Sequence, residues 1–138
     1  MLSPGYSYTA VQVKEIFMDR AMIHEKFRGI DRLFKRYKLN SSPIYLEFLK
    51  GERDLTCTAW GNPTYNTKGW KGPCYLITDA HHATFDGLMN DTPWEKYGHG
   101  KDPRCENCMV HCGYEPSAAL GVNSKLGDTF KMMTWALT

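Results

Sequence analysis

Three cysteines fall within eight residues, at Cys105, Cys108 and Cys112, and two more stand upstream at Cys57 and Cys74. Thiols that are two or three residues apart can be aimed at one centre by a single turn of chain, as in metal and iron–sulfur sites. The alternative is a set of buried, inert thiols. Cys105, however, follows a polar stretch of the chain rather than an apolar run. The spacing therefore favours ligation.

Length and charge limit the classes of protein to consider. At 138 residues the chain has the size of one domain, and a compact fold of this size buries about two-thirds of its unfolded surface. The formal net charge of +2 gives no reason to expect a nucleic acid or another polyanion as partner. The densest basic stretch, Lys26–Lys38, lies on an amphipathic pattern, and we expect it to be a solvated helix face.

The sequence contains no pattern typical of a membrane span or of a secretion signal. No apolar run approaches the roughly 20 residues that a transmembrane helix needs, and Met1–Tyr6 lacks the pattern of a signal peptide. We therefore expect a cytoplasmic protein, in which stable disulfides are disfavoured. Five cysteines would also leave one thiol over in a framework of disulfides.

Helical patterns dominate the first third of the chain. Apolar residues recur at steps of three and four from Ile16 to Tyr37, which predicts one long amphipathic helix with Gly29 as its weak point. The segment Thr9–Gln12 fits a capping box ahead of this helix.

Capping signals frame a second helix. Ser42 is a favoured N-cap residue and Pro43 a favoured first helical residue, so a helix of about two turns is predicted at Ile44–Lys50, ended by Gly51. Further short helices are predicted at His82–Met89, after Pro93, at Pro116–Leu120 and at Lys125–Leu137.

Two short strands are predicted at Leu55–Trp60 and Cys74–Thr78, on either side of a loop rich in Gly, Pro and Asn. Pairing them as a hairpin would bring Cys57 and Cys74 to one side, near its open end. Strand signals are sparse after Thr78. We therefore expect an α+β fold in which the cysteine loops, rather than a large sheet, fix the C-terminal half.

The cysteine pattern is similar to that of a known group of enzymes. Cys57-x11-Gly69-x4-Cys74, followed by the Cys105–Cys112 cluster, looks like an abbreviated SPASM/twitch auxiliary-cluster domain of radical S-adenosylmethionine (SAM) enzymes. Further segments shared with one family are Ser3-Pro4-Gly5-Tyr6, Ser42-Pro43, Trp60-Gly61-Asn62-Pro63, Pro73-Cys74-Tyr75-Leu76, Trp94 with Tyr97-Gly98, and Cys108-Met109-Val110-His111-Cys112-Gly113-Tyr114-Glu115. Through them the chain resembles the C-terminal half of the hopanoid-biosynthesis radical SAM proteins, the adenosyl-hopene transferase family.

The resemblance implies a larger enzyme. Members of that family carry an N-terminal partial (β/α) barrel whose Cys-x3-Cys-x2-Cys loop holds the SAM-cleaving cluster, and this sequence contains no such motif. Residues 1–54 would then be the last helices and strand of a truncated barrel, and residues 55–138 an auxiliary-cluster domain. We expect a fragment or split part whose barrel lies elsewhere. SAM and an apolar, hopene-like substrate would be used only in the full-length context, and the chain alone is expected to be inactive.

Four thiolates suit a [4Fe–4S] cluster and also suit tetrahedral zinc. Structural zinc sites usually pair two Cys-x2-Cys knuckles, which Cys57-x16-Cys74 does not provide, and the resemblance adds to the case for an auxiliary cluster. The expected ligands, firmest first, are Cys57 and Cys74, then Cys105 and Cys108, with Cys112 replacing one of them or remaining free. His111 is expected beside the ligands, donating to a sulfur or a carbonyl oxygen.

Large aromatic residues accompany the cysteines. Trp60, Trp70, Tyr75 and Trp94 could line a cavity for a polycyclic substrate, or they could pack around the cysteine loops as ordinary core residues. A non-enzymatic, zinc-stapled binding module remains the alternative function, and the ratio of bound iron to zinc would distinguish the two.

Overall fold

The computed structural model describes residues 2–5 and 13–137, so the expected capping box at Thr9–Gln12 lies outside the described residues. The helices are α1 (Arg20–Phe27), α2 (Asp31–Arg36), α3 (Pro43–Lys50), α4 (Phe85–Asp91), α5 (His111–Ala119) and α6 (Asp128–Leu137). Short 3-10 helices are η1 (Lys14–Ile16), η2 (Ala59–Gly61), η3 (Trp94–Lys96) and η4 (Pro103–Cys105). The strands are β1 (Tyr65–Asn66), β2 (Gly69–Gly72) and β3 (Ala80–His82).

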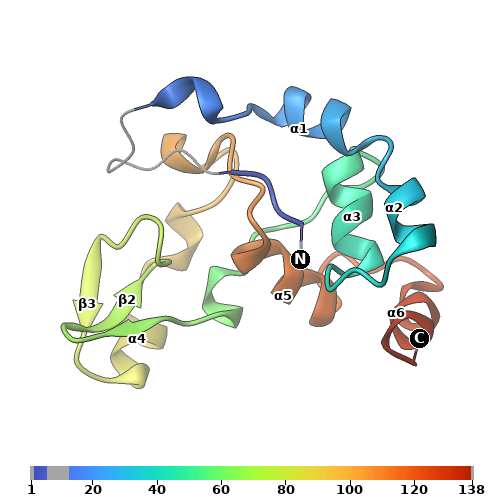
Figure 1. Ribbon diagram of the computed structural model, residues 1–138. Helices are drawn as coiled ribbons and strands as arrows, with labels where there is room; N and C mark the ends of the chain where they lie inside the picture. Colours follow the sequence, from blue (N-terminus) through green and yellow to red (C-terminus); the bar gives the residue numbers. More distant parts are fainter. Residues whose placement is uncertain (1, 6–12, 138) are drawn as a thin grey trace.

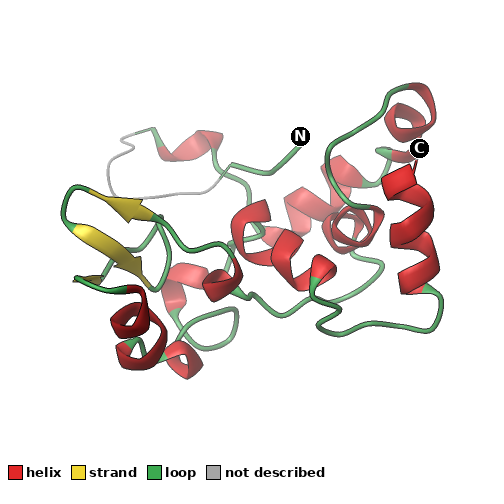
Figure 2. Ribbon diagram, turned by 90° about the horizontal axis from the view of Figure 1, so that it is seen from below, coloured by secondary structure: helices red, strands yellow, loops and turns green. Residues whose placement is uncertain are grey.

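The elements separate into a helical end and a sheet end. The sheet and α4 lie at one end of the molecule, helices α1, α2, α3 and α6 lie at the other, and α5 runs between them (Figures 1 and 2). The sheet is antiparallel throughout, with strand order β1-β2-β3. Helices with a small separate antiparallel sheet make an α+β fold, as the sequence predicts.

The single long helix predicted between Ile16 and Tyr37 is wrong. Asp19 starts α1 as an N-cap, because its side chain accepts a hydrogen bond from the Met22 N–H at 2.8 Å. The chain turns again around Gly29 before α2 begins. This break lies at Gly29, the weak point of the pattern. It allows Ile23 of α1 and Ile30, which precedes α2, to reach the same hydrophobic core.

Helix α3 confirms the capping signals in the sequence. The Ser42 hydroxyl accepts from the Tyr45 N–H at 3.1 Å, and Pro43 is the first helical residue. Gly51 ends the helix in the left-handed conformation with φ of +79°, which a residue with a side chain adopts only at a cost. The helix is buried on several sides, through Ile44, Tyr45, Leu46, Phe48 and Leu49.

Neither predicted strand forms. Leu55–Trp60 is extended chain that passes into η2, and Cys74–Thr78 is a turn closed by the Thr78 N–H on the Cys74 carbonyl oxygen at 3.0 Å. The hairpin lies inside the expected loop instead, where Tyr65 pairs with Trp70. The extended chain around Thr58 bonds to α5 rather than to another strand, which explains why its strand-like composition gives no sheet.

The remaining helices are shifted from their predicted bounds. Helix α4 starts at Phe85, because the preceding Thr84 caps it by accepting from the Gly87 N–H at 3.0 Å. The 3-10 helix after Pro93 and the helix within Lys125–Leu137 are present. The prediction that Pro116 opens a helix is wrong, since α5 starts five residues earlier, at His111, and contains the proline.

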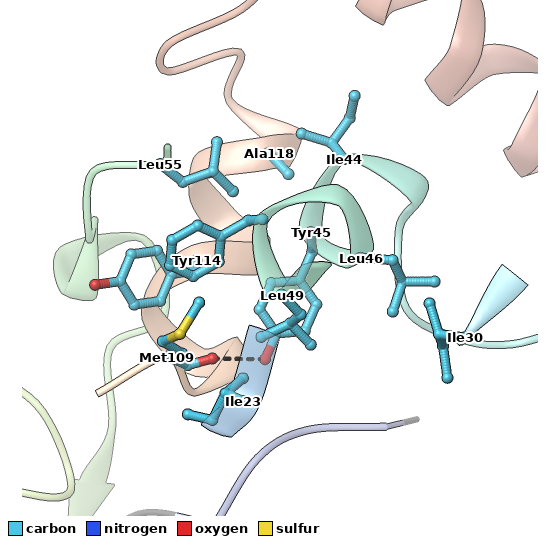
Figure 3. Close-up of a cluster of buried hydrophobic side chains, with 11 residues drawn as sticks. Ile23, Ile30, Ile44, Tyr45, Leu46, Leu49, Leu55, Met109, Tyr114 and Ala118 are labelled. Carbon is cyan, nitrogen blue, oxygen red and sulfur yellow. Dashed lines mark hydrogen bonds between the residues drawn. The ribbon is translucent and has the colours of Figure 1, made fainter. Parts of the chain in front are cut away.

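One hydrophobic core joins the two halves of the chain. Figure 3 shows α3 packed against Met109, Tyr114 and Ala118, with Leu55 at the edge. The Tyr45 hydroxyl donates to the Met109 carbonyl oxygen at 2.8 Å, and the rings of Phe48 and Tyr114 stack at 4.3 Å between centroids. The core thus contains residues from both 1–54 and 55–138. The division of the chain into two domains at residue 55 stays a prediction.

A buried ion pair fastens α6 to this core. The Arg53 guanidinium donates two hydrogen bonds to the Asp128 carboxylate, each 2.8 Å long, and a third to Glu47. Arg53 and Asp128 are both buried. Within the described residues, no helix is long and apolar enough to cross a lipid bilayer.

The Arg53–Asp128 pair should make stability depend on pH. Hydrogen bonds from Arg53 hold the pKa of Asp128 down at about 2, so its carboxylate stabilises the fold above about pH 4, and this contribution is lost as pH falls towards 2. We expect Asp128→Asn to lower the free energy of unfolding at pH 7 by about 3 kcal/mol, because Arg53 loses its buried partner.

Urea unfolding at pH 7 and pH 3 measures both effects. The exposed neighbour Asp54 supplies the control, and Asp54→Asn should stay within about 0.5 kcal/mol of the unsubstituted chain. Equal losses in the two variants would show that the pair contributes nothing specific.

Candidate metal centre

All five cysteines border one cavity. The cavity has a volume of about 660 Å³, and its wall includes Cys57, Cys74, Cys105, Cys108 and Cys112. The rest of the wall is mainly apolar and includes Leu55, Leu76, Ile77, Val110 and Val122. Three separate stretches of chain therefore bring their thiols to the same space, although the predicted hairpin does not form. The roles of these cysteines as metal ligands stay a prediction.

Buried hydroxyl groups hold the Cys57 segment against α5. The Thr58 N–H and hydroxyl both donate to the Gly113 carbonyl oxygen, at 2.9 and 3.2 Å. The Ser117 hydroxyl lies 2.8 Å from that of Thr58 and bonds to the carbonyl oxygens of Thr56 and Gly113. Because buried hydroxyls are costly without partners, this network fixes Cys57 beside the first turn of α5.

Two glycines allow the Cys57 segment to lie directly on the helix. A Cβ atom added at Gly113 would collide with the Cys57 sulfur, and one added at Gly61 would come within 2.8 Å of the Pro116 side chain. Pro116 also lacks the N–H that would bond to the Cys112 carbonyl oxygen within the helix. Helix α5 therefore lacks one backbone hydrogen bond at the place where it packs closely against η2.

The loop from Cys105 to Cys112 is held by residues of the N-terminal half. The Arg20 guanidinium donates to the carbonyl oxygens of Glu106 and Cys108 at 2.8 and 3.2 Å, and to the Tyr114 hydroxyl at 3.0 Å. Tyr45 holds the next carbonyl along the loop, that of Met109. These bonds fix the backbone on which Cys108 is mounted.

An exposed ion-pair network joins the other two cysteine segments. Arg104, the residue before Cys105, donates to both carboxylate oxygens of Asp79 at 2.7 and 2.8 Å and also pairs with Asp102. Tyr97 donates to Asp79 at 2.9 Å. Asp79 directly follows the turn that carries Cys74, so the network ties this turn to the Cys105 loop.

Burial makes these thiols hard to ionise. It is the main cause that raises the pKa of Cys57 to about 12 and that of Cys112 to about 11. It also raises the pKa of Cys105 and of Cys108, and negative charge on neighbouring cysteines adds to the rise at all four. Mutual effects of this kind require the sulfurs to lie near one another. Raised values are the opposite of what a nucleophilic thiol needs.

Nearby hydrogen-bond donors act in the opposite direction. Backbone groups lower the pKa of four of the thiols: Ala59 acts on Cys57, Gly98 on Cys105, Val110 on Cys108, and Gly113 on Cys112. The Tyr75 hydroxyl also lowers the pKa of Cys112. Such donors stabilise a thiolate rather than a thiol, which suits sulfurs that are deprotonated by binding a metal.

The four predicted cavity aromatics lie in different places. Trp60 and Trp94 are part of the cavity wall. Trp70 lies instead between Tyr65 and Phe85, in edge contacts of 5.2 Å on the sheet, and is absent from the wall as the described residues define it. Tyr75 is also outside that wall, although its hydroxyl is near enough to lower the pKa of Cys112.

His111 sits at the first position of α5, next to Cys112. Its backbone N–H donates to the Ser3 hydroxyl at 3.4 Å, and its buried Nδ1 has no hydrogen-bond partner among the described residues. The predicted role of His111, donating to a sulfur or a carbonyl, therefore stays a prediction.

Several supporting residues were not identified from the sequence. Arg20 and Tyr45 lie more than sixty residues from the loop that they hold, and no local pattern announces such contacts. The one available signal was Gly113, directly after Cys112. Glycine at such a position often permits another segment of the chain to approach the backbone closely.

Comparison with known proteins gives one match. A family model described as "Domain of unknown function (DUF3463)" matches residues 1–132. No curated protein and no solved structure matches this chain. Among the described residues, no group of three or more His, Cys, Asp or Glu side chains is arranged so that it could hold a metal ion as it stands.

The contact between Gly113 and Cys57 predicts an unusual response to alanine. Alanine normally stabilises a helix interior by about 1 kcal/mol relative to glycine, but at Gly113 the added methyl would displace the Cys57 sulfur. We expect Gly113→Ala to destabilise the chain by about 1–3 kcal/mol in thermal unfolding. Gly29→Ala is the control, since an added Cβ there meets no atom within 4 Å, and it should not destabilise. Unchanged stability of Gly113→Ala would contradict the described position of Cys57.

Proposed function

The chain belongs to the family described as "Domain of unknown function (DUF3463)", and we propose that it is the auxiliary-cluster part of a radical SAM enzyme of hopanoid biosynthesis. Its cysteines would hold one [4Fe–4S] cluster in the cavity that all five of them border. This shared cavity is the observation that carries the proposal, because segments spread from residue 57 to residue 112 have no other reason to bring every thiol of the chain to one place.

The thiols suit a bound metal group in their chemistry. Burial keeps Cys57, Cys108 and Cys112 protonated in the protein alone, whereas a coordinated thiol gives up its proton. Backbone N–H groups then have thiolates to which they can donate. Hydrogen bonds to cluster sulfurs and burial of the cluster are also the means by which proteins set its reduction potential.

The size of the cavity favours a cluster over one zinc ion. Tetrahedral zinc with bonds of about 2.3 Å draws its four thiolates to within about 3.8 Å of one another and leaves no space between them. The five thiols here border about 660 Å³, room for a group much larger than one ion. The spacing Cys57-x16-Cys74 also provides no zinc knuckle.

The apolar wall of the same cavity supports the proposed substrate class. Trp60, Trp94, Leu76 and Ile77 contribute to it, and an apolar polycyclic molecule of the hopene type could bury part of its surface against these side chains. When bound, the cluster would transfer electrons or staple these loops. SAM cleavage would belong to a barrel bearing Cys-x3-Cys-x2-Cys, to which residues 1–54 would contribute the last elements.

Metal analysis tests the cluster directly. After anaerobic reconstitution with iron and sulfide, we expect about four irons and four sulfides per chain. Cys57→Ser, Cys74→Ser, Cys105→Ser and Cys108→Ser should each lose most of the iron. Cys112→Ser serves as the matched control and should retain it, because the four proposed ligands, Cys57, Cys74, Cys105 and Cys108, all remain. One tightly bound zinc per chain and no iron would instead assign the zinc-stapled binding module.

A second prediction concerns SAM. A protein-ligated auxiliary cluster leaves no iron open to chelate the amino and carboxylate groups of SAM, so the reconstituted chain should produce no 5′-deoxyadenosine with SAM and dithionite. Adding a separately expressed barrel half should restore cleavage. Turnover by the chain alone, measured by chromatography, would contradict the assignment of Cys57, Cys74, Cys105 and Cys108 to a closed site.

A further inference from the structure

Helix α6 exposes a continuous apolar stripe. Leu126, Phe130, Met133 and Leu137 follow one another at steps of four, three and four residues, which places them on one face of the helix and the turn before it. Leu126 is fully exposed, and 73% of Phe130 and 84% of Leu137 are accessible to solvent. A surface helix normally turns polar residues outwards, so a stripe of this kind marks an interaction site.

The stripe is not needed to hold α6 in place. The opposite side of the helix is fixed by Asp128, which pairs with Arg53, and by Met132, which packs against the core. The Trp135 indole N–H donates to the Leu39 carbonyl oxygen at 3.4 Å. Helix α6 therefore has two apolar faces, and only one of them is covered by residues that the structure describes.

A strongly basic segment adjoins this helix. Trp135 shares a small hollow with residues 34–39, and α2 and α6 lie at the same end of the molecule (Figure 1). The basic side chains at residues 26–38 are all exposed, and they are Lys26, Arg28, Arg32, Lys35, Arg36 and Lys38. Asp31 is the one acidic residue in this range, and it pairs with Lys50 at 3.1 Å.

The positive charge of the chain is therefore concentrated in residues 26–38. The whole chain has a formal net charge of +2, and residues 26–38 alone carry more positive charge than that, so the other residues together are net negative. Two aromatic side chains lie near the basic residues: Tyr37, half exposed and in contact with the Arg36 guanidinium, and Trp135, which borders the hollow formed by residues 34–39.

We propose that α6 and α2 form a binding surface for an anionic lipid bilayer. Helix α6 would lie in the plane of the membrane surface with Phe130 and Leu137 immersed, while the basic residues of 26–38 contact lipid headgroups. An amphipathic helix with a basic flank and interfacial aromatics has the composition of such surfaces, and each basic residue near an anionic leaflet contributes about 1 kcal/mol.

Charge decides against a second copy as the occupant. A two-fold symmetric dimer through this face would place two copies of the basic segment next to each other, which like charges oppose. An anionic bilayer offers both the apolar interior that the stripe needs and the opposite charge. This inference goes beyond the proposed function and does not depend on it.

Vesicle sedimentation tests the surface with the full chain. We expect the chain to bind vesicles that contain phosphatidylglycerol and phosphatidylcholine more than ten times as tightly as vesicles of phosphatidylcholine alone, and to release in high salt. The double variant F130S/L137S should bind at least about tenfold more weakly to both kinds of vesicle, because apolar burial is lost. The double variant K35E/R36E should lose the preference for the anionic lipid.

The control is Ile16→Ser, which removes an exposed apolar side chain from η1, a different element. It should bind vesicles as the unsubstituted chain does. Circular dichroism of each variant checks that the fold is kept, as expected for exposed positions. Failure of the unsubstituted chain to bind anionic vesicles, or equal binding by F130S/L137S, would overturn the proposal. A dimer that F130S/L137S dissolves, without vesicle binding, would assign the stripe to a second copy.

Discussion

Three backbone carbonyl oxygens of the cysteine loop accept hydrogen bonds from two side chains of the other half of the chain. Arg20 binds the carbonyl oxygens of Glu106 and Cys108, and Tyr45 binds that of Met109. Hydrogen bonds from a charged donor contribute about 1.5–3 kcal/mol each, and a buried tyrosine hydroxyl is costly without a partner. Removing these donors would weaken the hold of the core on the loop, and the positions of Cys108 and Cys112 depend on the shape of that loop.

The thiol cavity is assembled by polar contacts around its edge rather than by a sheet. Hydroxyl groups of Thr58 and Ser117 hold the first cysteine segment on α5, and Arg104 ties the Cys105 loop to Asp79. The sulfurs themselves add little to this assembly while protonated, because thiols are weak hydrogen-bonding groups. The five thiols are therefore brought to the cavity by their surroundings, without any contribution from thiolate charge.

Local signals in the sequence predicted local structure well and pairing poorly. Ser42, Pro43 and Gly51 specify the ends of α3 through backbone geometry that involves only neighbouring residues, and the structure matches them. The composition of Leu55–Trp60 resembles a strand, yet its hydrogen bonds go to α5, which no local pattern could show. The spacing of the cysteines led us to expect their sulfurs near one another, and all five border one cavity; their role as ligands stays a prediction. The roles of Arg20 and Tyr45 were not predictable, since each acts across a long stretch of chain.

The contacts that build the cavity join residues far apart in sequence: 88 positions separate Arg20 from Cys108, and 64 separate Tyr45 from Met109. Closing such long loops lowers the conformational entropy of the chain before the stabilising contacts form, so structures with many contacts of this kind fold slowly. Helix α3, with its own caps and eight residues, can form early, whereas the cavity can form only after α5 has been synthesised. During that interval the thiols face solvent, open to oxidation. For the proposed cluster, this order of folding would make the timing of its delivery as important as its affinity for the chain.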